Sequence, residues 1–148
     1  MPITFRSAHA DDFAYCETLY FAEMASIIQE LNLDRVTQKA SFREQWKVAE
    51  VRIIVLNGLD IGWLQTVVLD GELFLGQLFI DNSFQRRGIG TEVIKRLVTE
   101  AENSHQAVTL GVVKINPALR LYKRLGFQVV GEDKFKFYMR LDPQRASL

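Results

Sequence analysis

The sequence predicts one α/β domain of 148 residues, with a mixed, mostly antiparallel sheet of about seven strands and four helices on both of its faces. Two short turn signals, Asn57-Gly58 and Asp70-Gly71, separate apolar segments and are typical of antiparallel hairpins. Between Leu73 and Val113 the order strand, helix, strand predicts a parallel, right-handed crossover. With 48% apolar residues, a chain of this length can bury a single core.

The segment before the first turn signal is expected to begin with one strand and two helices. A strand covers 3–6, and an aspartate within 8–12 can cap the helix that starts there. Apolar side chains at helical spacing continue this helix to about residue 31. A second helix is expected over roughly 37–50, where three apolar residues recur at intervals of four and three: Phe42, Trp46 and Ala49.

The two turn signals join three strands into an antiparallel meander. These strands are expected over 51–56, 60–69 and 72–80. The third is apolar on both faces, which predicts a central strand covered by helices on both sides. Gly76 in its middle indicates a bulge or the close approach of a ligand.

The C-terminal half is expected to add two helices and three strands. The first helix begins near Ile89, because apolar residues recur there every four positions and polar residues fill the other face. A short helix follows, with Asn116 as its cap and Pro117 at its first position, and ends at Gly126. The strands are expected over 107–113, 127–131 and 135–141, and residues 142–148 as a frayed tail.

Composition argues against several classes of protein. The net charge is zero, so a dominant nucleic-acid-binding surface is not expected. The single cysteine, Cys16, argues against a disulfide framework or a cysteine metal site, so we expect a cytoplasmic protein without a metal and a buried Cys16. No apolar run approaches the roughly 18 residues of a membrane span, and the chain begins with a strand pattern instead of a signal peptide.

Charge is divided along the chain. Residues 1–74 contain 6 Lys/Arg and 11 Asp/Glu, whereas residues 75–148 contain 12 and 7. This division suits a protein that holds an anionic ligand on one side and a cationic ligand on the other, although solvated faces produce similar counts by chance.

A glycine-rich turn at residues 85–91 opens the helix near Ile89 and is a candidate phosphate site. Helix N-termini present free N–H groups and partial positive charge, and arginine forks suit phosphate. The turn lacks the lysine of a P-loop, and Val93 stands where the dinucleotide fingerprint needs Gly or Ala. Taken alone, the turn is equally consistent with a helix N-terminus carrying two solvated arginines.

Together with a second motif, this turn resembles the GNAT superfamily of acyl-CoA-dependent N-acyltransferases. Residues 85–90 (QRRGIG) match its Q/R-x-x-G-x-G/A pyrophosphate loop. Residues 116–127 (NPALRLYKRLGF) match its Asn-Pro-Ala, Leu-Tyr and Leu-Gly-Phe block. The order of the expected elements agrees over nearly the whole chain, so the resemblance implies a GNAT fold over residues 1–148.

The resemblance also implies roles for individual residues, with acetyl-CoA as the cosubstrate. Asn116 would bond the pantetheine arm, and Tyr122 would lie near the thioester sulfur and protonate the departing thiolate as general acid. Backbone groups on the central strand would bond the arm and polarise the thioester carbonyl: Leu78, Phe79 and Ile80. The residues expected around the pyrophosphate are Gln85, Arg86, Arg87, Gly88, Ile89, Gly90 and Thr91.

The general base carries no motif. An alkyl ammonium has a pKa of about 10 and must lose a proton before it attacks, either to a carboxylate or to a held water. Glu23 is a candidate because it lies on the segment that lines the acceptor side in this family. Glu72 is a second candidate because it begins the central strand. Each residue is more simply explained as a surface carboxylate or as one that contacts another residue of the site.

The leading hypothesis is direct transfer of an acetyl group to a primary amine in a ternary complex, without a covalent intermediate. The acidic first half favours a cationic acceptor, either a small amine or a peptide or protein amine. The alternative is a non-catalytic acyl-CoA sensor. A homodimer through the last strands stays open, because the apolar residues there would serve equally to close the core: Phe135, Phe137, Tyr138 and Met139.

Overall fold

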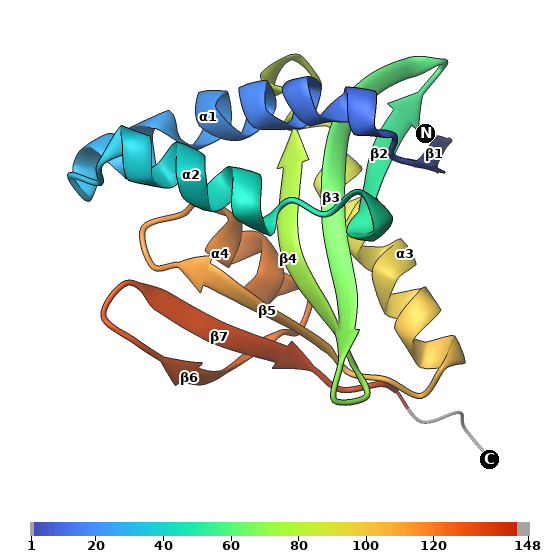
Figure 1. Ribbon diagram of the computed structural model, residues 1–148. Helices are drawn as coiled ribbons and strands as arrows, with labels where there is room; N and C mark the ends of the chain where they lie inside the picture. The colour runs from blue at the N-terminus through green and yellow to red at the C-terminus, as the bar shows by residue number, and fades with distance from the viewer. Residues whose placement is uncertain (1, 145–148) are drawn as a thin grey trace. The chain divides into compact units, whose positions relative to one another are not determined.

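A seven-stranded mixed sheet runs through the computed structural model, which describes residues 2–144 (Figure 1). The strands are β1 (Ile3–Ser7), β2 (Val51–Leu56), β3 (Leu59–Leu69), β4 (Glu72–Ile80), β5 (Val108–Val113), β6 (Gln128–Glu132) and β7 (Lys136–Leu141). The helices are α1 (Phe13–Glu30), α2 (Arg35–Gln45), α3 (Ile89–Asn103) and α4 (Ala118–Arg124). The predicted fold class is therefore confirmed.

The chain consists of two compact units. The first combines Met1–Gln65 with Gln77–Ile89, and the second combines Thr66–Gly76 with Gly90–Leu148. The order of hydrogen-bonded strands is β1-β2-β3-β4-β5-β7-β6, and both β3 and β4 contribute residues to each unit. Of the tail expected at 142–148, residues 145–148 lie outside the described part of the chain.

The first unit is built on antiparallel strands covered by two helices. β1 is antiparallel to β2, with Ile3 opposite Leu56 and Ser7 opposite Arg52, and β2 pairs with β3. In Figure 1, α1 crosses in front of β3 near the top of the view, and the segment that follows α2 crosses in front of β3 lower down. Their apolar side chains form one cluster with the strands, which includes Cys16, Leu19, Phe42, Ile53 and Trp63. The two helices are held in place by this burial of apolar area.

The second helix ends earlier than its apolar spacing predicted. α2 stops at Gln45, Trp46 is extended, and a separate 3-10 turn follows at Val48–Glu50. A tertiary contact holds this end of the helix: the buried Gln65 on β3 donates Nε2 to the Gln45 carbonyl (2.9 Å) and to the Glu50 carboxylate (3.0 Å). The terminal carbonyl of the helix thereby obtains a partner outside the helix.

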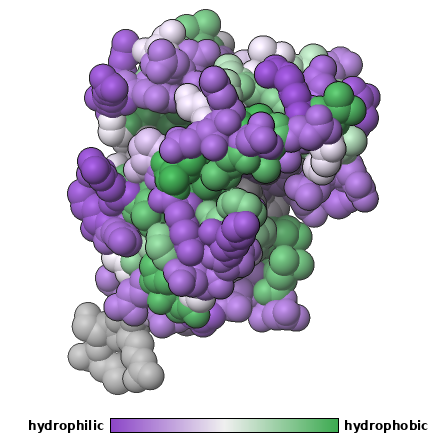
Figure 2. Space-filling view, turned by 90° about the vertical axis from the view of Figure 1, so that its left-hand side faces the viewer, coloured by the Kyte–Doolittle hydropathy of each residue, from purple (hydrophilic) through white to green (hydrophobic). Residues whose placement is uncertain are grey.

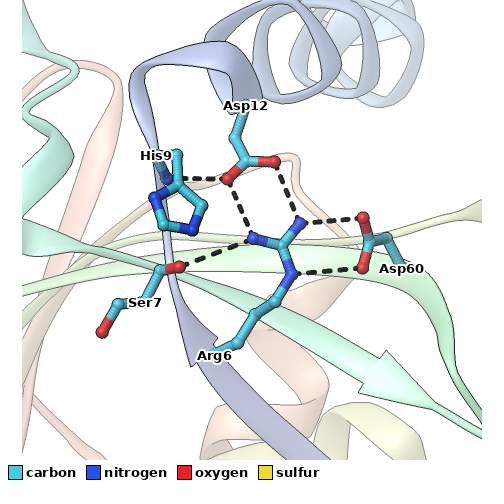
Figure 3. A network of polar contacts seen from close by, with 5 residues as sticks. All are labelled: Arg6, Ser7, His9, Asp12 and Asp60. Carbon is cyan, nitrogen blue, oxygen red and sulfur yellow. Dashed lines mark hydrogen bonds and ion pairs between the residues drawn. The ribbon is translucent and has the colours of Figure 1, made fainter.

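The aspartate before α1 is used differently from a simple helix cap. Asp12 accepts a hydrogen bond from the backbone N–H of His9 (2.8 Å) and two from the Arg6 guanidinium (2.9 and 3.0 Å), as Figure 3 shows. Arg6 also donates to Asp60 on β3 (2.9 Å). This Arg6 cluster, made of Arg6, Asp12 and Asp60, joins β1, the start of α1 and β3.

The second unit contains the parallel crossover that the sequence predicted. β4 is parallel to β5, with Leu73 opposite Val108 and Leu75 opposite Leu110. β5 is antiparallel to β7, with Val108 opposite Leu141 and Val113 opposite Lys136. Four apolar residues of α3 are at most 1% exposed: Val93, Ile94, Leu97 and Ala101. The amphipathic pattern of this helix therefore marks its buried face as expected.

The short helix α4 lies where the sequence predicted it but begins one residue later, with Pro117 as its N-cap and Ala118 as its first residue. The Asn116 Oδ1 atom accepts a hydrogen bond from the Ala118 N–H (2.9 Å), and Gly126 has φ +100° just after the helix. A left-handed residue at that position ends a helix, and glycine adopts it without steric cost.

The surface is mixed. On the face drawn in Figure 2, hydrophilic residues predominate and hydrophobic residues lie in several groups among them. Within residues 2–144, no helix is both long enough and apolar enough to cross a membrane. Among the residues considered for a homodimer, Phe135 and Tyr138 are exposed but Met139 is buried at 1%. Met139 therefore belongs to the core, and the dimer stays a prediction.

Candidate active site

The turn before α3 has the open geometry of an anion site. Arg86 (φ +65°) and Gly88 (φ +77°) both have left-handed backbone, and α3 starts at Ile89, which is 2% exposed. Arg86, Arg87 and Gly88 are exposed. A non-glycine residue in this backbone region costs about 1 kcal/mol or more, so Arg86 is held there by its surroundings.

The space around Gly88 shows whether a pyrophosphate fits this turn. A Cβ atom added to Gly88 would have no other atom within 4 Å, so the backbone faces open space. The Arg87 guanidinium lies 5.3 Å from the centre of the Phe84 ring. Within residues 2–144, neither Arg86 nor Arg87 has a carboxylate partner. Two uncompensated cations beside a helix N-terminus fit an anionic group.

The end of β4 is held by bonds from two directions. Gln85 donates Nε2 to the Ile80 carbonyl (2.7 Å), and the Asp81 N–H donates to the Ile61 carbonyl of β3 (2.8 Å). The side chains of Leu78, Phe79 and Ile80 are half-buried. The Phe79 ring lies 5.3 Å from Tyr20 and 5.5 Å from Trp63, centre to centre. The strand end expected to meet the thioester is therefore packed on both its backbone and its side chains.

Sequence analysis missed one residue beside this strand end. A Cβ atom on Gly62 of β3 would lie closer than 3.0 Å to the Phe79 carbonyl oxygen and 3.1 Å from the Ile80 Cα. The available signal was a glycine inside an apolar strand, which indicates close approach of another backbone. The same signal is present at Gly76, where the sequence predicted a bulge or the close approach of a ligand.

The two candidate bases have different surroundings. Glu23 on α1 is half-buried and accepts a hydrogen bond from the same Gln85 Nε2 that binds the Ile80 carbonyl. Glu72, at the other end of β4 from Ile80, forms an ion pair with Arg140. The structure therefore brings Glu23, but not Glu72, to the Gln85 side chain.

Tyr122 and Asn116 lie in the second unit. Tyr122 on α4 is 8% exposed and lies edge-on to Phe127, with 5.8 Å between ring centres. Burial raises the pKa of Tyr122 to about 12 because the phenolate would lose its hydration. The Oδ1 atom of Asn116 is occupied by the helix cap. A ligand could therefore bond to Asn116 through its amide nitrogen or through the second lone pair of Oδ1.

Cys16 is not part of a reactive site. Its side chain is fully buried, as expected, and burial raises the pKa of the thiol to about 12. Among the described residues, no three His, Cys, Asp or Glu side chains are grouped so that they could hold a metal ion.

Comparisons with known proteins agree with the motifs. A family profile for the acetyltransferase (GNAT) domain matches residues 44–129, more than half of the chain. The uncharacterized N-acetyltransferase YafP of Escherichia coli K12 is 23% identical over 124 residues, which cover 78% of this chain and 76% of that protein. The spermine/spermidine N(1)-acetyltransferase of Bacillus subtilis 168 is 33% identical over 69 residues, 45% of each chain.

A solved structure shares the fold. The PaiA N-acetyltransferase of Thermoplasma acidophilum, determined in complex with coenzyme A, superposes with a TM-score of 0.77 at 15% identity. The superposition covers 96% of this chain and 99% of that one. The chain therefore belongs to the GNAT family of acetyl-CoA-dependent N-acetyltransferases.

Proposed function

We propose that residues 1–148 act as a single GNAT domain that transfers an acetyl group from acetyl-CoA directly to a primary amine in a ternary complex. The observation that carries this proposal is the Gln85 side chain, which binds both the Glu23 carboxylate and the Ile80 carbonyl. A carboxylate able to accept a proton is thereby tied to the strand end expected to bind the thioester.

Acetyl-CoA supplies the acetyl group as an activated thioester. The Gln85 N–H donates to the Asn82 carbonyl (3.3 Å), so the backbone N–H groups from Arg86 to Thr91, with the Arg86 and Arg87 side chains, would hold the pyrophosphate of acetyl-CoA. The open space at Gly88 supports this role. The backbone groups of Leu78, Phe79 and Ile80 would bond the pantetheine arm, as would the Asn116 amide. A preorganised backbone N–H would also stabilise the charge that develops on the thioester oxygen.

We infer that Glu23, and not Glu72, takes the proton from the amine. Glu72 is already paired with Arg140, whereas the partner of Glu23 is the neutral amide of Gln85. Loss of a general base slows a reaction by about 100-fold or more, so Glu23→Gln should lower kcat by that factor. Glu72→Gln is the matched control and should leave kcat within about twofold, because it removes a carboxylate from a surface ion pair. Equal losses in both variants would exclude Glu23 as the specific base.

Tyr122 would donate its proton to the sulfur as the carbon–sulfur bond breaks. Because its pKa is raised to about 12, the hydroxyl keeps its proton at neutral pH. A free thiol has a pKa of about 8.5, well below that of Tyr122. The pKa values of the proton donor and the sulfur are therefore close only if the sulfur is buried as well. Tyr122→Phe should lower kcat by about 100-fold while the Kd of acetyl-CoA changes little. An unchanged kcat would remove Tyr122 from the mechanism.

The pH dependence of kcat gives a second test of Tyr122. The rate should rise with pH as the amine loses its proton. Tyr122 has a raised pKa and stays protonated further into the alkaline range. The rate should not fall at any pH up to about 10, because Tyr122 ionises only near pH 12. A fall in kcat between pH 8 and 9 that disappears in Tyr122→Phe would show that Tyr122 ionises there, and would contradict the raised pKa of its hydroxyl.

The acceptor is tested by the release of the CoA thiol from acetyl-CoA with a panel of amines. Spermidine and spermine come first, because residues 11–34 contain six acidic and no basic residues and one relative acetylates polyamines. Amino acids, aminoglycosides and short peptides complete the panel. Binding of acetyl-CoA without transfer to any amine would favour the sensor. Failure to bind acetyl-CoA would overturn the proposed site.

A further inference from the structure

The carbonyl of Phe79 faces a glycine on the neighbouring strand. Gly62 is buried in β3 and pairs with Ile54 of β2. The β2–β3 register is irregular beside it, between Ile54 and Val55, where β3 contains one extra residue. The end of β4 therefore lies against an irregular part of β3.

The approach of the two backbones leaves no room for a side chain. A Cβ on Gly62 would lie well within van der Waals contact of the Phe79 oxygen and 3.1 Å from the Ile80 Cα. Both are backbone atoms, which cannot rotate away as a flexible side chain can. The Ile80–Asp81 peptide that follows is held by Gln85, at the Ile80 carbonyl, and by the Asp81–Ile61 hydrogen bond, which fixes the C-terminal end of the Phe79–Ile80 peptide. A methyl group at residue 62 would therefore displace this peptide.

The direction of the Phe79 carbonyl determines the direction of the next N–H group. In a trans peptide the C=O and N–H bonds point in opposite directions, and the structure contains no cis peptide bond among the described residues. Because the Phe79 oxygen faces Gly62, the N–H of Ile80 points away from β3. This N–H is a donor that β3 does not use.

We propose that Gly62 is a positioning residue for acyl transfer: by lacking a side chain it lets the Phe79 carbonyl turn toward β3 and so aims the Ile80 N–H away from β3, toward the thioester oxygen. This inference rests on the proposed function, in which the backbone of Leu78–Ile80 contacts the thioester. Gly62 contacts no substrate itself and acts through the orientation of one peptide group.

The test compares Gly62→Ala with Gly131→Ala. Gly131 in β6 is a matched control, because a Cβ there would meet only the Tyr138 ring at 4.0 Å. We expect Gly62→Ala to lower kcat by about 100-fold, the typical effect of losing one oxyanion donor, and to raise the Kd of acetyl-CoA. The Kd of 3′-phospho-ADP, which has the pyrophosphate but no pantetheine arm, should stay within about twofold, because the turn before α3 is unchanged. Gly131→Ala should match the wild type in all three measurements.

A second substitution separates the backbone from side-chain crowding. The Ile54 Cδ1 atom would lie 3.3 Å from the new Cβ, and Ile54→Val removes that atom. The double variant Ile54→Val/Gly62→Ala should therefore stay impaired if the Phe79 backbone is the obstacle. It also serves in place of Gly62→Ala if the single variant does not fold.

Three results would overturn the inference. They are a kcat near the wild-type value in Gly62→Ala, recovery in the double variant, and an equal loss of affinity for acetyl-CoA and 3′-phospho-ADP. A wild-type protein that binds acetyl-CoA but transfers to no amine would instead overturn the proposed function. That result differs from a defect confined to Gly62→Ala.

Discussion

Two groups of arginines, Arg6 alone and the pair Arg86 and Arg87, have opposite electrostatic surroundings. Arg6 donates to both oxygens of Asp12 and to Asp60, so its charge is compensated within the fold (Figure 3). Arg86 and Arg87 are exposed beside the N-terminus of α3 and, among residues 2–144, have no carboxylate partner. The first group ties two strands and a helix together, and the second leaves its positive charge available.

The difference shows how the same residue type serves stability in one place and binding in another. A compensated arginine fixes geometry through bidentate hydrogen bonds and attracts a further anion weakly. An uncompensated arginine contributes little to stability but much to the potential that an anion experiences. We therefore expect substitutions in the two groups to affect different measurements.

The largest effect is expected in the turn. Substitution of both Arg86 and Arg87 by Ala should raise the Kd of CoA by about 100-fold at low salt, since each charged contact with a phosphate contributes about 1.4 kcal/mol. The melting temperature should change little, because both side chains are exposed. Isothermal titration at low and high salt checks this, with Lys39→Ala on α2 as a control for the loss of a surface charge. A Kd that does not change would show that the turn does not hold the phosphates.

A smaller effect, on stability alone, is expected in the Arg6 cluster. Asp12→Asn should lower the free energy of unfolding by about 1–2 kcal/mol, because the Asp12 side chain is only 14% exposed and loses a bidentate pair with Arg6. Thermal unfolding measures the change, and the KM for acetyl-CoA should match the wild type. A raised KM with an unchanged melting temperature would reverse the roles of the two arginine groups.

The pH dependence of the same pair has a definite sign. Arg6 lowers the pKa of Asp12 below its ordinary value of 3.8, so the stabilisation is present above that pH and is lost as the pH falls through the lowered value. The difference in melting temperature between wild type and Asp12→Asn should therefore be constant from about pH 5 to 8 and shrink below about pH 4. A difference that grows as the pH falls would contradict the pairing.

The smallest effect is expected for the second carboxylate of the cluster. Asp60 is 41% exposed, so Asp60→Asn should cost about 0.5 kcal/mol or less, as for most surface ion pairs. Thermal unfolding of Asp12→Asn, Asp60→Asn and the double variant separates the two contributions. A larger loss of stability in Asp60→Asn than in Asp12→Asn would show that the burial of the carboxylate does not determine how much each ion pair contributes.

Local patterns were sufficient to predict most of the elements. The turn pairs at residues 57–58 and 70–71, the apolar face of α3 and the cap at Asn116 are each determined by neighbours in the chain, and the structure contains all of them. The end of α2 was predicted wrongly, and there the last carbonyl of the helix bonds a side chain of β3, a contact that the local pattern does not contain.

The sequence by itself determined the family and the turn that we propose binds phosphate, because a helix N-terminus with two glycines and two arginines depends only on consecutive residues. The tertiary structure alone decided three other features. It tied Glu23 to Gln85, it paired Glu72 with Arg140, and it placed Gly62 against the Phe79 carbonyl. Each depends on residues far apart in the chain, whose meeting follows from strand register and helix packing, and no local pattern contains that information.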